Sequence, residues 1–136
     1  MIYLDTCLVI YWVENHTAFG PIVRKCAATA APAPIAISPL VMAEALVMPF
    51  RQKNTITIQK FKAFFTSALI LPMTEAVFME AAHLRAAHIG LKMPDALHLA
   101  CAKQQGCTEI WTNDDRLGRV AGTMAVNVLE GVRSQQ

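Results

Sequence analysis

The chain has 136 residues, of which 54% are hydrophobic and 16% charged, and its formal net charge is +2. This length fits one domain spanning residues 1–136, and the composition excludes a disordered chain. The mildly basic balance permits contact with a polyanion but does not require it. The longest uncharged run, residues 26–43, is broken by Pro32, Pro34 and Pro39, which argues against a membrane span.

Cysteine usage and the first residues bear on the compartment. The four cysteines form no C-x-x-C pair and have no zinc-ligand spacing, so we interpret them as reduced, small hydrophobic filler. Reduced thiols are typical of a cytoplasmic protein. No basic segment precedes Asp5, so the start does not resemble a signal peptide.

Short apolar runs alternate with helical patterns along the chain. Pro21 and Pro94 are suited to helix starts, Thr74 to an N-cap, and Gly90 and Gly106 to helix ends. The predicted strands are 2–4, 35–37, 68–71, 108–112 and 124–129, and the predicted helices are 6–14, 21–30, 39–48, 58–67, 74–89, 95–105 and 116–121. This alternation predicts an α/β sandwich with a mainly parallel sheet.

Four acids follow the ends of predicted strands or open helices. Asp5 comes directly after the first strand and Asp114 just after the fourth, while Glu44 lies in the helix after the second strand and Asp95 in the first turn of a helix. Sites in parallel α/β sheets form beyond the carboxyl ends of the strands. The four acids therefore have a route to one edge of the sheet.

Clustered carboxylates repel one another unless a cation neutralises them. Mg²⁺ and Mn²⁺ prefer carboxylate and water oxygens, and such ions polarise a phosphoryl oxygen and activate a water. Phosphodiester hydrolysis is the chemistry that this set of acids predicts.

Each acid also has a structural interpretation. Asp5 could begin a helix that Thr6 caps, and Asp95 after Pro94 suits a positive helix end. Asp114 fits ordinary turn chemistry. Glu44, the only charge between Lys25 and Arg51, favours a functional role because it interrupts an apolar helix.

Taken in order, four segments resemble a PIN domain of the VapC-like toxin type. They are Ile2-Tyr3-Leu4-Asp5-Thr6, Ser38-Pro39-Leu40-Val41-Met42-Ala43-Glu44, Pro94-Asp95-Ala96-Leu97-His98-Leu99-Ala100 and Trp111-Thr112-Asn113-Asp114. The resemblance covers essentially the whole chain. The order and spacing of the segments carry it more than any one of them.

The resemblance implies a three-layer α/β/α sandwich and a Mg²⁺- or Mn²⁺-dependent endoribonuclease that acts as the toxin of a toxin–antitoxin pair. By it, Asp5 and Asp95 are the principal metal ligands, and Glu44 and Asp114 complete the catalytic acids. RNA is the implied substrate, and a cognate antitoxin and a homodimer are the implied assemblies.

Other residues near these segments support the acids or the substrate. Thr6 and Asn113 are candidate supports, and the position after Thr6, often Asn or Ser in this family, is Cys7, whose thiol is a poor hydrogen-bond partner. Arg116 and Arg119 follow the last acid and could hold an RNA backbone, or form the solvated face of a short helix.

Three further features keep two interpretations each. Asp115 could be a fifth acid, but we favour a turn residue, and His98 could be a ligand, but we favour a packed, hydrogen-bonded histidine. Aromatic residues on helices of the first half are interpreted mostly as core, and any exposed ones would suit a partner helix; they are Trp12, Phe50, Phe61, Phe64 and Phe65.

Two rival functions remain open at this point. One is a phosphoaspartate-type α/β phosphotransfer domain, which also places Asp after strand one but needs a late Lys, and no Lys follows Lys103. The other is a non-catalytic PIN-like module that binds RNA or protein. No P-loop, dinucleotide or G-x-S-x-G motif appears.

Overall fold

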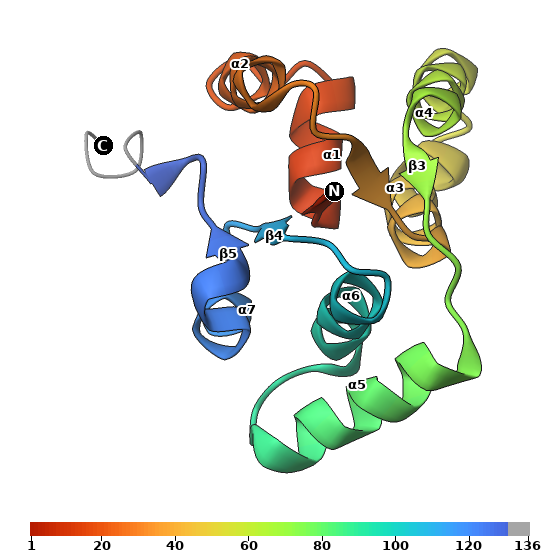
Figure 1. The fold of residues 1–136 in the computed structure, drawn as a ribbon. Coiled ribbons are helices and arrows are strands. Elements are labelled where there is room, and N and C mark those ends of the chain that lie inside the picture. The colour runs from red at the N-terminus through yellow and green to blue at the C-terminus, as the bar shows by residue number, and fades with distance from the viewer. Residues whose placement is uncertain (131–136) are drawn as a thin grey trace.

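A computed structural model describes residues 1–130, in which a parallel sheet lies between helices (Figure 1). The strands are β1 (Ile2–Leu4), β2 (Ile35–Ile37), β3 (Leu69–Ile70), β4 (Glu109–Trp111) and β5 (Ala125–Val126). The helices are α1 (Thr6–Val13), α2 (Gly20–Ala30), α3 (Pro39–Arg51), α4 (Thr55–Ser67), α5 (Glu75–Ala87), α6 (Met93–Gln104) and α7 (Asp115–Ala121), followed by the 3-10 turn η1 (Gly122–Met124).

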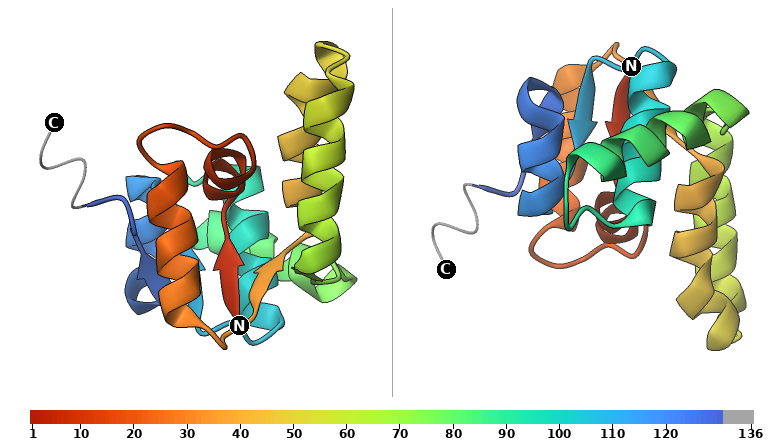
Figure 2. Two further views of the ribbon diagram at one scale, coloured as in Figure 1. Left: turned by 90° about the horizontal axis from the view of Figure 1, so that it is seen from above. Right: turned by 90° about the horizontal axis from the view of Figure 1, so that it is seen from below.

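The sheet has the strand order β3-β2-β1-β4-β5, and all four strand pairs are parallel. The order runs outward from β1 in one direction and from β4 in the other, so the reversal falls between β1 and β4. Such a reversal opens a crevice beyond the carboxyl ends of the strands. In Figure 2 the arrows of β1 and β2 point toward the same edge, where α1 begins.

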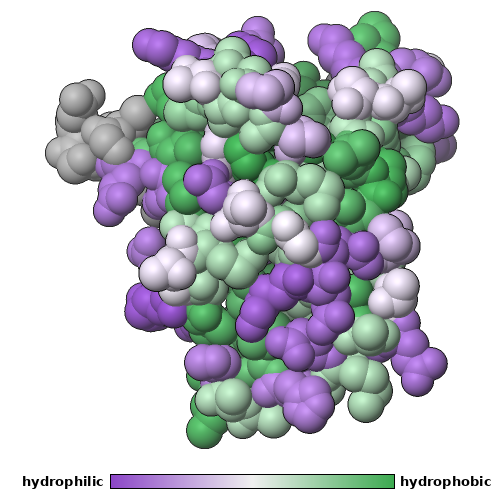
Figure 3. All heavy atoms as spheres, viewed as in Figure 1, coloured by the Kyte–Doolittle hydropathy of each residue, from purple (hydrophilic) through white to green (hydrophobic). Residues whose placement is uncertain are grey.

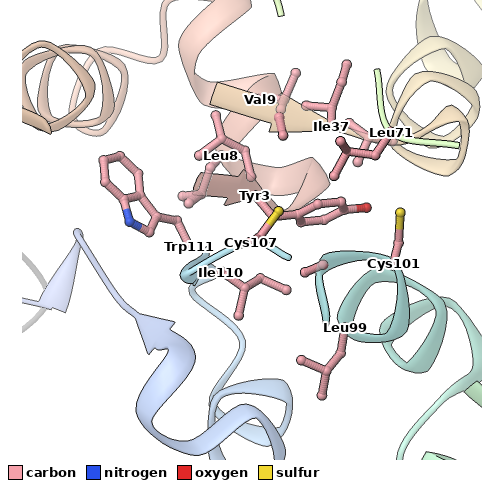
Figure 4. Packing of buried hydrophobic residues seen from close by; sticks show 14 of the residues in the cluster. Tyr3, Leu8, Val9, Ile37, Leu71, Leu99, Cys101, Cys107, Ile110 and Trp111 are labelled. Atoms are coloured by element: carbon pink, nitrogen blue, oxygen red, sulfur yellow. The ribbon is translucent and has the colours of Figure 1, made fainter. Parts of the chain in front are cut away.

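Helices cover both faces of the sheet, as the predicted sandwich requires. α1 and α2 lie on one face and α5, α6 and α7 on the other, while α3 and α4 pack together beside the β3 edge (Figure 1). Figure 4 shows the Tyr3 ring directed toward α6, with Leu8 and Val9 on one side of the sheet and Ile110 and Leu99 on the other. Strands buried on both faces explain the continuous apolar runs.

Several element ends differ from the predicted ones for local reasons. The third helix continues through the buried Pro49 to Arg51 rather than ending at residue 48. The fourth begins at Thr55 because the Asn54 side chain accepts a hydrogen bond from the Thr57 amide at 3.1 Å. The last strand is shorter than predicted because η1 takes residue 124 and residues 127–129 form a turn, in which the Leu129 amide donates to the Asn127 side chain.

Two predicted helix-end features have a different form in the structure. Thr74 occupies the N-cap position of α5, but its side chain makes no capping hydrogen bond. α6 begins at Met93, so Pro94 lies within its first turn rather than before it. Gly106 follows α6 with a φ of +79°, a conformation that favours glycine.

The exposed surface is unevenly apolar. Large apolar side chains are exposed on the α3–α4 pair, on β3 and on α5, and Figure 3 shows hydrophobic surface gathered over β3 and the neighbouring helices. The aromatic prediction holds in part, since Phe61 and Phe65 are buried whereas Phe50 is exposed. No helix within residues 1–130 combines the length and apolarity needed to cross a bilayer.

The cysteines have four different environments. Cys101 and Cys107 are buried and Cys26 is half-buried, as filler would be. Cys7 is exposed, so the filler interpretation is wrong for it. No disulfide joins the four thiols, all of which lie in the described part of the chain.

Candidate active site

Asp5 lies at the end of the central strand and joins three elements. It is the N-cap of α1, and its Oδ1 accepts a hydrogen bond from the Thr6 amide at 2.8 Å. Its Oδ2 accepts one from the Thr112 hydroxyl at 2.8 Å, and its own amide donates to the Trp111 carbonyl. The structural alternative for Asp5 had Thr6 as the cap of this helix, whereas Asp5 itself is the cap.

Glu44 reaches the same place from the second turn of α3. Its Oε1 accepts hydrogen bonds from the Thr6 hydroxyl at 2.7 Å and from His98 Nε2 at 2.6 Å. Partial burial raises the pKa of Glu44, but the hydrogen bonds from His98 and Thr6 outweigh it and leave the pKa below its usual value. Glu44 is therefore held as a carboxylate with Oε2 outside these bonds.

A buried chain of hydrogen bonds orients His98. The imidazole is 1% exposed, and its Nδ1 lies 2.6 Å from the Tyr3 hydroxyl, which is 2.7 Å from Ser38 Oγ. Since the Glu44 carboxylate only accepts, Nε2 carries a proton; in the neutral ring Nδ1 then accepts from Tyr3, and Ser38 donates to Tyr3. Burial raises the pKa of Tyr3 well above its usual value, so the phenol keeps its proton.

This arrangement confirms the interpretation of His98 as a packed, hydrogen-bonded histidine. It also brings the ring into the acid cluster, since Nε2 lies 3.8 Å from Asp5 Oδ1. His98 thus touches two of the four predicted acids without facing the open pocket.

Asp95 is half-buried in the first turn of α6 and, within residues 1–130, its carboxylate has no hydrogen-bond or ion-pair partner. Burial raises the pKa of Asp95, and repulsion from Asp114 and then Asp5 raises it further, against a smaller opposing effect of His98. A carboxylate destabilised by neighbouring carboxylates is one that a cation would stabilise.

Asp114 is exposed and caps α7, where its Oδ1 accepts a hydrogen bond from the Leu117 amide at 2.9 Å. Its own amide donates to the Thr112 hydroxyl at 3.1 Å, so Thr112 links it to Asp5. Asn113 points elsewhere, toward the Tyr11 hydroxyl at 3.5 Å. Thr6 thus makes a direct contact with a predicted acid, whereas Asn113 makes none.

Glu44, Asp95 and Asp114 border one pocket of about 650 Å³. It is lined by Glu44, Lys92, Pro94, Asp95, Asp114, Asp115, Arg116 and Arg119. Asp5 does not line it and is only 7% exposed, so it lies beneath the rim rather than on it. Asp115, interpreted as a turn residue, is the first residue of α7 and lines the pocket as well.

The donor set suits a hard cation. Within residues 1–130 there is no group of three or more His, Cys, Asp or Glu side chains arranged to hold a metal ion. Mg²⁺ keeps several of its waters and binds proteins through one or two carboxylates, so it does not need such a group. The carboxylates around this pocket fit Mg²⁺ or Mn²⁺ in the type of donor that they offer.

The sequence did not single out Thr112, Tyr3, Ser38 or Lys92, although all four belong to the site or its support. Thr112 could have been found, because it ends the strand just before Asp114. Tyr3 and Ser38 could not, because Tyr3 bonds His98, 95 residues away in the chain, and Ser38 bonds Tyr3, 35 residues away, and no local pattern defines either contact.

Comparison with known proteins was made for both sequence and structure. A model of the PIN domain family matches residues 2–123. A comparison with curated protein sequences found no match.

Solved structures similar to this chain include three toxin components or complexes. A toxin–antitoxin complex from Klebsiella pneumoniae has a TM-score of 0.76 and 22% identity over 94% of this chain and 98% of that chain. VapBC2 from Rickettsia felis, bound to a promoter DNA fragment, has a TM-score of 0.76 and 21% identity over 93% and 98%. VapC20 from Mycobacterium tuberculosis, a sarcin–ricin loop cleaving toxin, has a TM-score of 0.73 and 16% identity over 88% and 94%.

At these identities the solved structures establish the fold, whereas the family model spans most of the sequence and includes all four acids. Together with the parallel sheet and the acidic edge, they lead to one conclusion: this chain belongs to the PIN domain family.

Proposed function

We propose that this protein is a Mg²⁺- or Mn²⁺-dependent endoribonuclease and the toxin of a toxin–antitoxin pair. The observation that carries the proposal is the meeting of Glu44, Asp95 and Asp114 around one pocket, with Asp5 beneath it. Burial and then repulsion from Asp114 and Asp5 raise the pKa of Asp95, which supports a cation there. Arg116 and Arg119 on the same pocket support an anionic substrate.

In this proposal Asp5 and Asp95 hold the metal ion, with Asp114 contributing directly or through water. The ion, when bound, supplies a polarised phosphoryl oxygen and a water of lowered pKa. Glu44 Oε2 accepts a hydrogen bond from the attacking water and orients it, because Oε1 is already held by Thr6 and His98. Arg116 and Arg119 bind the RNA backbone next to the scissile phosphate.

The rival phosphoaspartate function is disfavoured by the state of Asp5. A phosphate-accepting aspartate needs a strongly nucleophilic oxygen, but both Asp5 oxygens accept hydrogen bonds, which lower their nucleophilicity while leaving each a lone pair for a metal ion. Beryllofluoride binding at Asp5 would contradict this argument.

Cleavage of total RNA by the purified chain tests the nuclease. We expect discrete fragments with Mn²⁺, none with EDTA and none from Asp95→Asn. Glu80→Gln is a matched control, because this glutamate lies on α5 in an ion pair with Lys103 and does not line the pocket. Absence of cutting by the wild type would leave the non-catalytic binding module as the better description.

The toxin role is supported by the relatives, two of which are described as toxin–antitoxin or VapBC assemblies. We propose a cognate antitoxin, a homodimer and a cytoplasmic location, in keeping with four free thiols. Induced expression should arrest growth, and Asp95→Asn should abolish the arrest. Light scattering of the purified chain tests the dimer, and a monomeric mass would contradict it.

A further inference from the structure

A second hollow adjoins the acidic pocket and has no role in the function proposed above. Its volume is about 390 Å³. It is lined by Ala87, His88, Ile89, Arg116, Arg119 and Val120. Arg116 and Arg119 line both hollows, so they form a cationic ridge between the acids and this second space.

One loop and one helix build both hollows. The loop between α5 and α6 gives His88 and Ile89 to the second hollow and Lys92 to the first, while α7 gives the two arginines to each. A chain that leaves the acidic pocket across the arginines therefore enters the second hollow directly.

Two carbonyls of this loop accept hydrogen bonds from arginine side chains. Arg116 Nη1 donates to the Gly90 carbonyl at 2.9 Å, and Arg85 Nε donates to the Leu91 carbonyl at 2.9 Å. Leu91 is buried, and Gly90 has a φ of +93° that completes the turn. Ile89 precedes these two residues, and its side chain is fully exposed.

A single exposed isoleucine is ordinary on a protein surface. Ile89 differs because it stands on a fixed loop, beside an imidazole, and faces a hollow whose other wall carries two guanidinium groups. An apolar and aromatic surface next to paired cations matches a nucleotide, which presents a flat base and an adjacent phosphate.

We propose that this hollow binds the nucleotide next to the scissile phosphate of a single-stranded RNA. Its base packs on His88 and Ile89, and its phosphate is held by Arg116 and Arg119. The inference rests on the proposed nuclease function and adds the side on which the RNA chain continues. An acidic peptide would also be attracted by the arginines, but its carboxylates would be repelled by the acids of the adjoining pocket.

Binding of fluorescein-labelled oligo-U and oligo-A to the Asp95→Asn protein with Mn²⁺ tests this subsite without cleavage. Adding His88→Ala and Ile89→Ala should weaken binding roughly tenfold, in the range found when a stacking side chain is removed. The matched control adds His83→Ala and Ile56→Ala, two exposed side chains that line neither hollow. The control pair should bind as the parent does.

The salt dependence separates base contacts from phosphate contacts. Arg119→Gln should lower the slope of log affinity against log salt by about one, whereas the His88 and Ile89 changes should weaken binding with the slope unchanged. Equal binding by the subsite pair and the control pair would overturn the inference, and so would failure of the Asp95→Asn parent to bind either oligonucleotide at low salt.

Cleavage by the same substitutions in the otherwise wild-type chain distinguishes the two proposals. A raised KM with unchanged kcat in the subsite pair supports the inference. Normal cutting by both pairs, with equal KM, would overturn the inference and leave the nuclease intact. No Asp95-dependent cutting by the wild type would overturn the nuclease, while the binding comparison would still decide whether the hollow holds RNA.

Discussion

The two walls of the acidic pocket differ in how their charges are held. On the inner wall, Asp5 and Glu44 accept hydrogen bonds from Thr112, Thr6 and His98, and all except Glu44 are buried. On the outer wall, Asp114 and Asp115 are exposed, and the Asp95 carboxylate has no partner among the described residues. Asp5 and Glu44 are therefore held by hydrogen bonds within the fold, whereas burial and then repulsion from Asp114 and Asp5 raise the pKa of Asp95.

The largest expected effect is a loss of cleavage in variants of both walls, and the stability of these variants then distinguishes the two walls. Asp95→Asn and Asp5→Asn should each reduce cleavage at least about 100-fold, since both remove a proposed metal ligand. Only Asp5→Asn should also lower the free energy of unfolding, by about 1–3 kcal/mol, because its amide NH2 replaces the buried oxygen that accepts the Thr112 hydrogen bond. Urea titration measures the difference, and equal stabilities would break the comparison.

Tyr3→Phe tests how far the Tyr3 hydroxyl supports His98, which in turn bonds Glu44 on the inner wall. Loss of the hydroxyl leaves His98 Nδ1 and Ser38 without their buried partner, which should cost about 1–3 kcal/mol of stability. Because Glu44 still accepts from Nε2, nitrogen NMR of the ring should show the proton kept on Nε2. A mixed tautomer would mean that the Tyr3 hydroxyl helps to hold the proton there.

The pH dependence should have opposite signs on the two walls. The pKa of Glu44 is lowered, so its contribution to stability is present at neutral pH and lost as pH falls below about 4.5; the deficit of Glu44→Gln should shrink on acidification. The pKa of Asp95 is raised, so its ionised form costs stability at neutral pH. Asp95→Asn should therefore gain stability at neutral pH, and this gain should vanish in acid.

Unfolding midpoints measured from neutral pH to about pH 3, across the usual range of carboxyl pKa values, check both signs with one set of proteins. Slopes of the same sign for the two variants would contradict the division into a stabilising and a destabilising wall.

The smallest effect concerns Cys7, the exposed thiol beside the acids. Partial burial and then Asp5, Glu44 and Asp114 raise its pKa, so it should alkylate slowly at neutral pH. Asp114→Asn should speed alkylation by less than about tenfold, since it removes only one of these charges. Mass spectrometry of iodoacetamide-treated protein gives the rates, and Cys26 is the internal control whose rate should not change.

The sequence predicted the meeting of the acids because the rule it used concerns chain direction alone. Asp5 and Asp114 follow β1 and β4, and parallel strands bring such positions to one edge. The seven α-helices and five strands of residues 1–130 were predicted in a different way, from periodicity and turn residues. The predicted roles of these acids stay predictions until cleavage and metal binding are measured.

Other parts depend on contacts that no local pattern contains. The Tyr3–His98 bond forms because α6 packs against the sheet opposite β1, and the second hollow forms because α7 lies beside the α5–α6 loop. The helix starting at Thr55 was predicted three residues late because capping by Asn54 is decided by side-chain geometry. Contacts between distant segments and the choice of helix cap could therefore not be predicted from the sequence pattern.

The double duty of Asp5, as helix cap and as partner of Thr112, has a genetic consequence. If overexpression of this chain is lethal, survivors carrying changes at Asp95, whose carboxylate has no partner among the described residues, should accumulate full-length folded protein. Survivors with changes at Asp5 should contain less of it, because a weakened fold is degraded. Immunoblots of such survivors would sort escape mutations into these two groups.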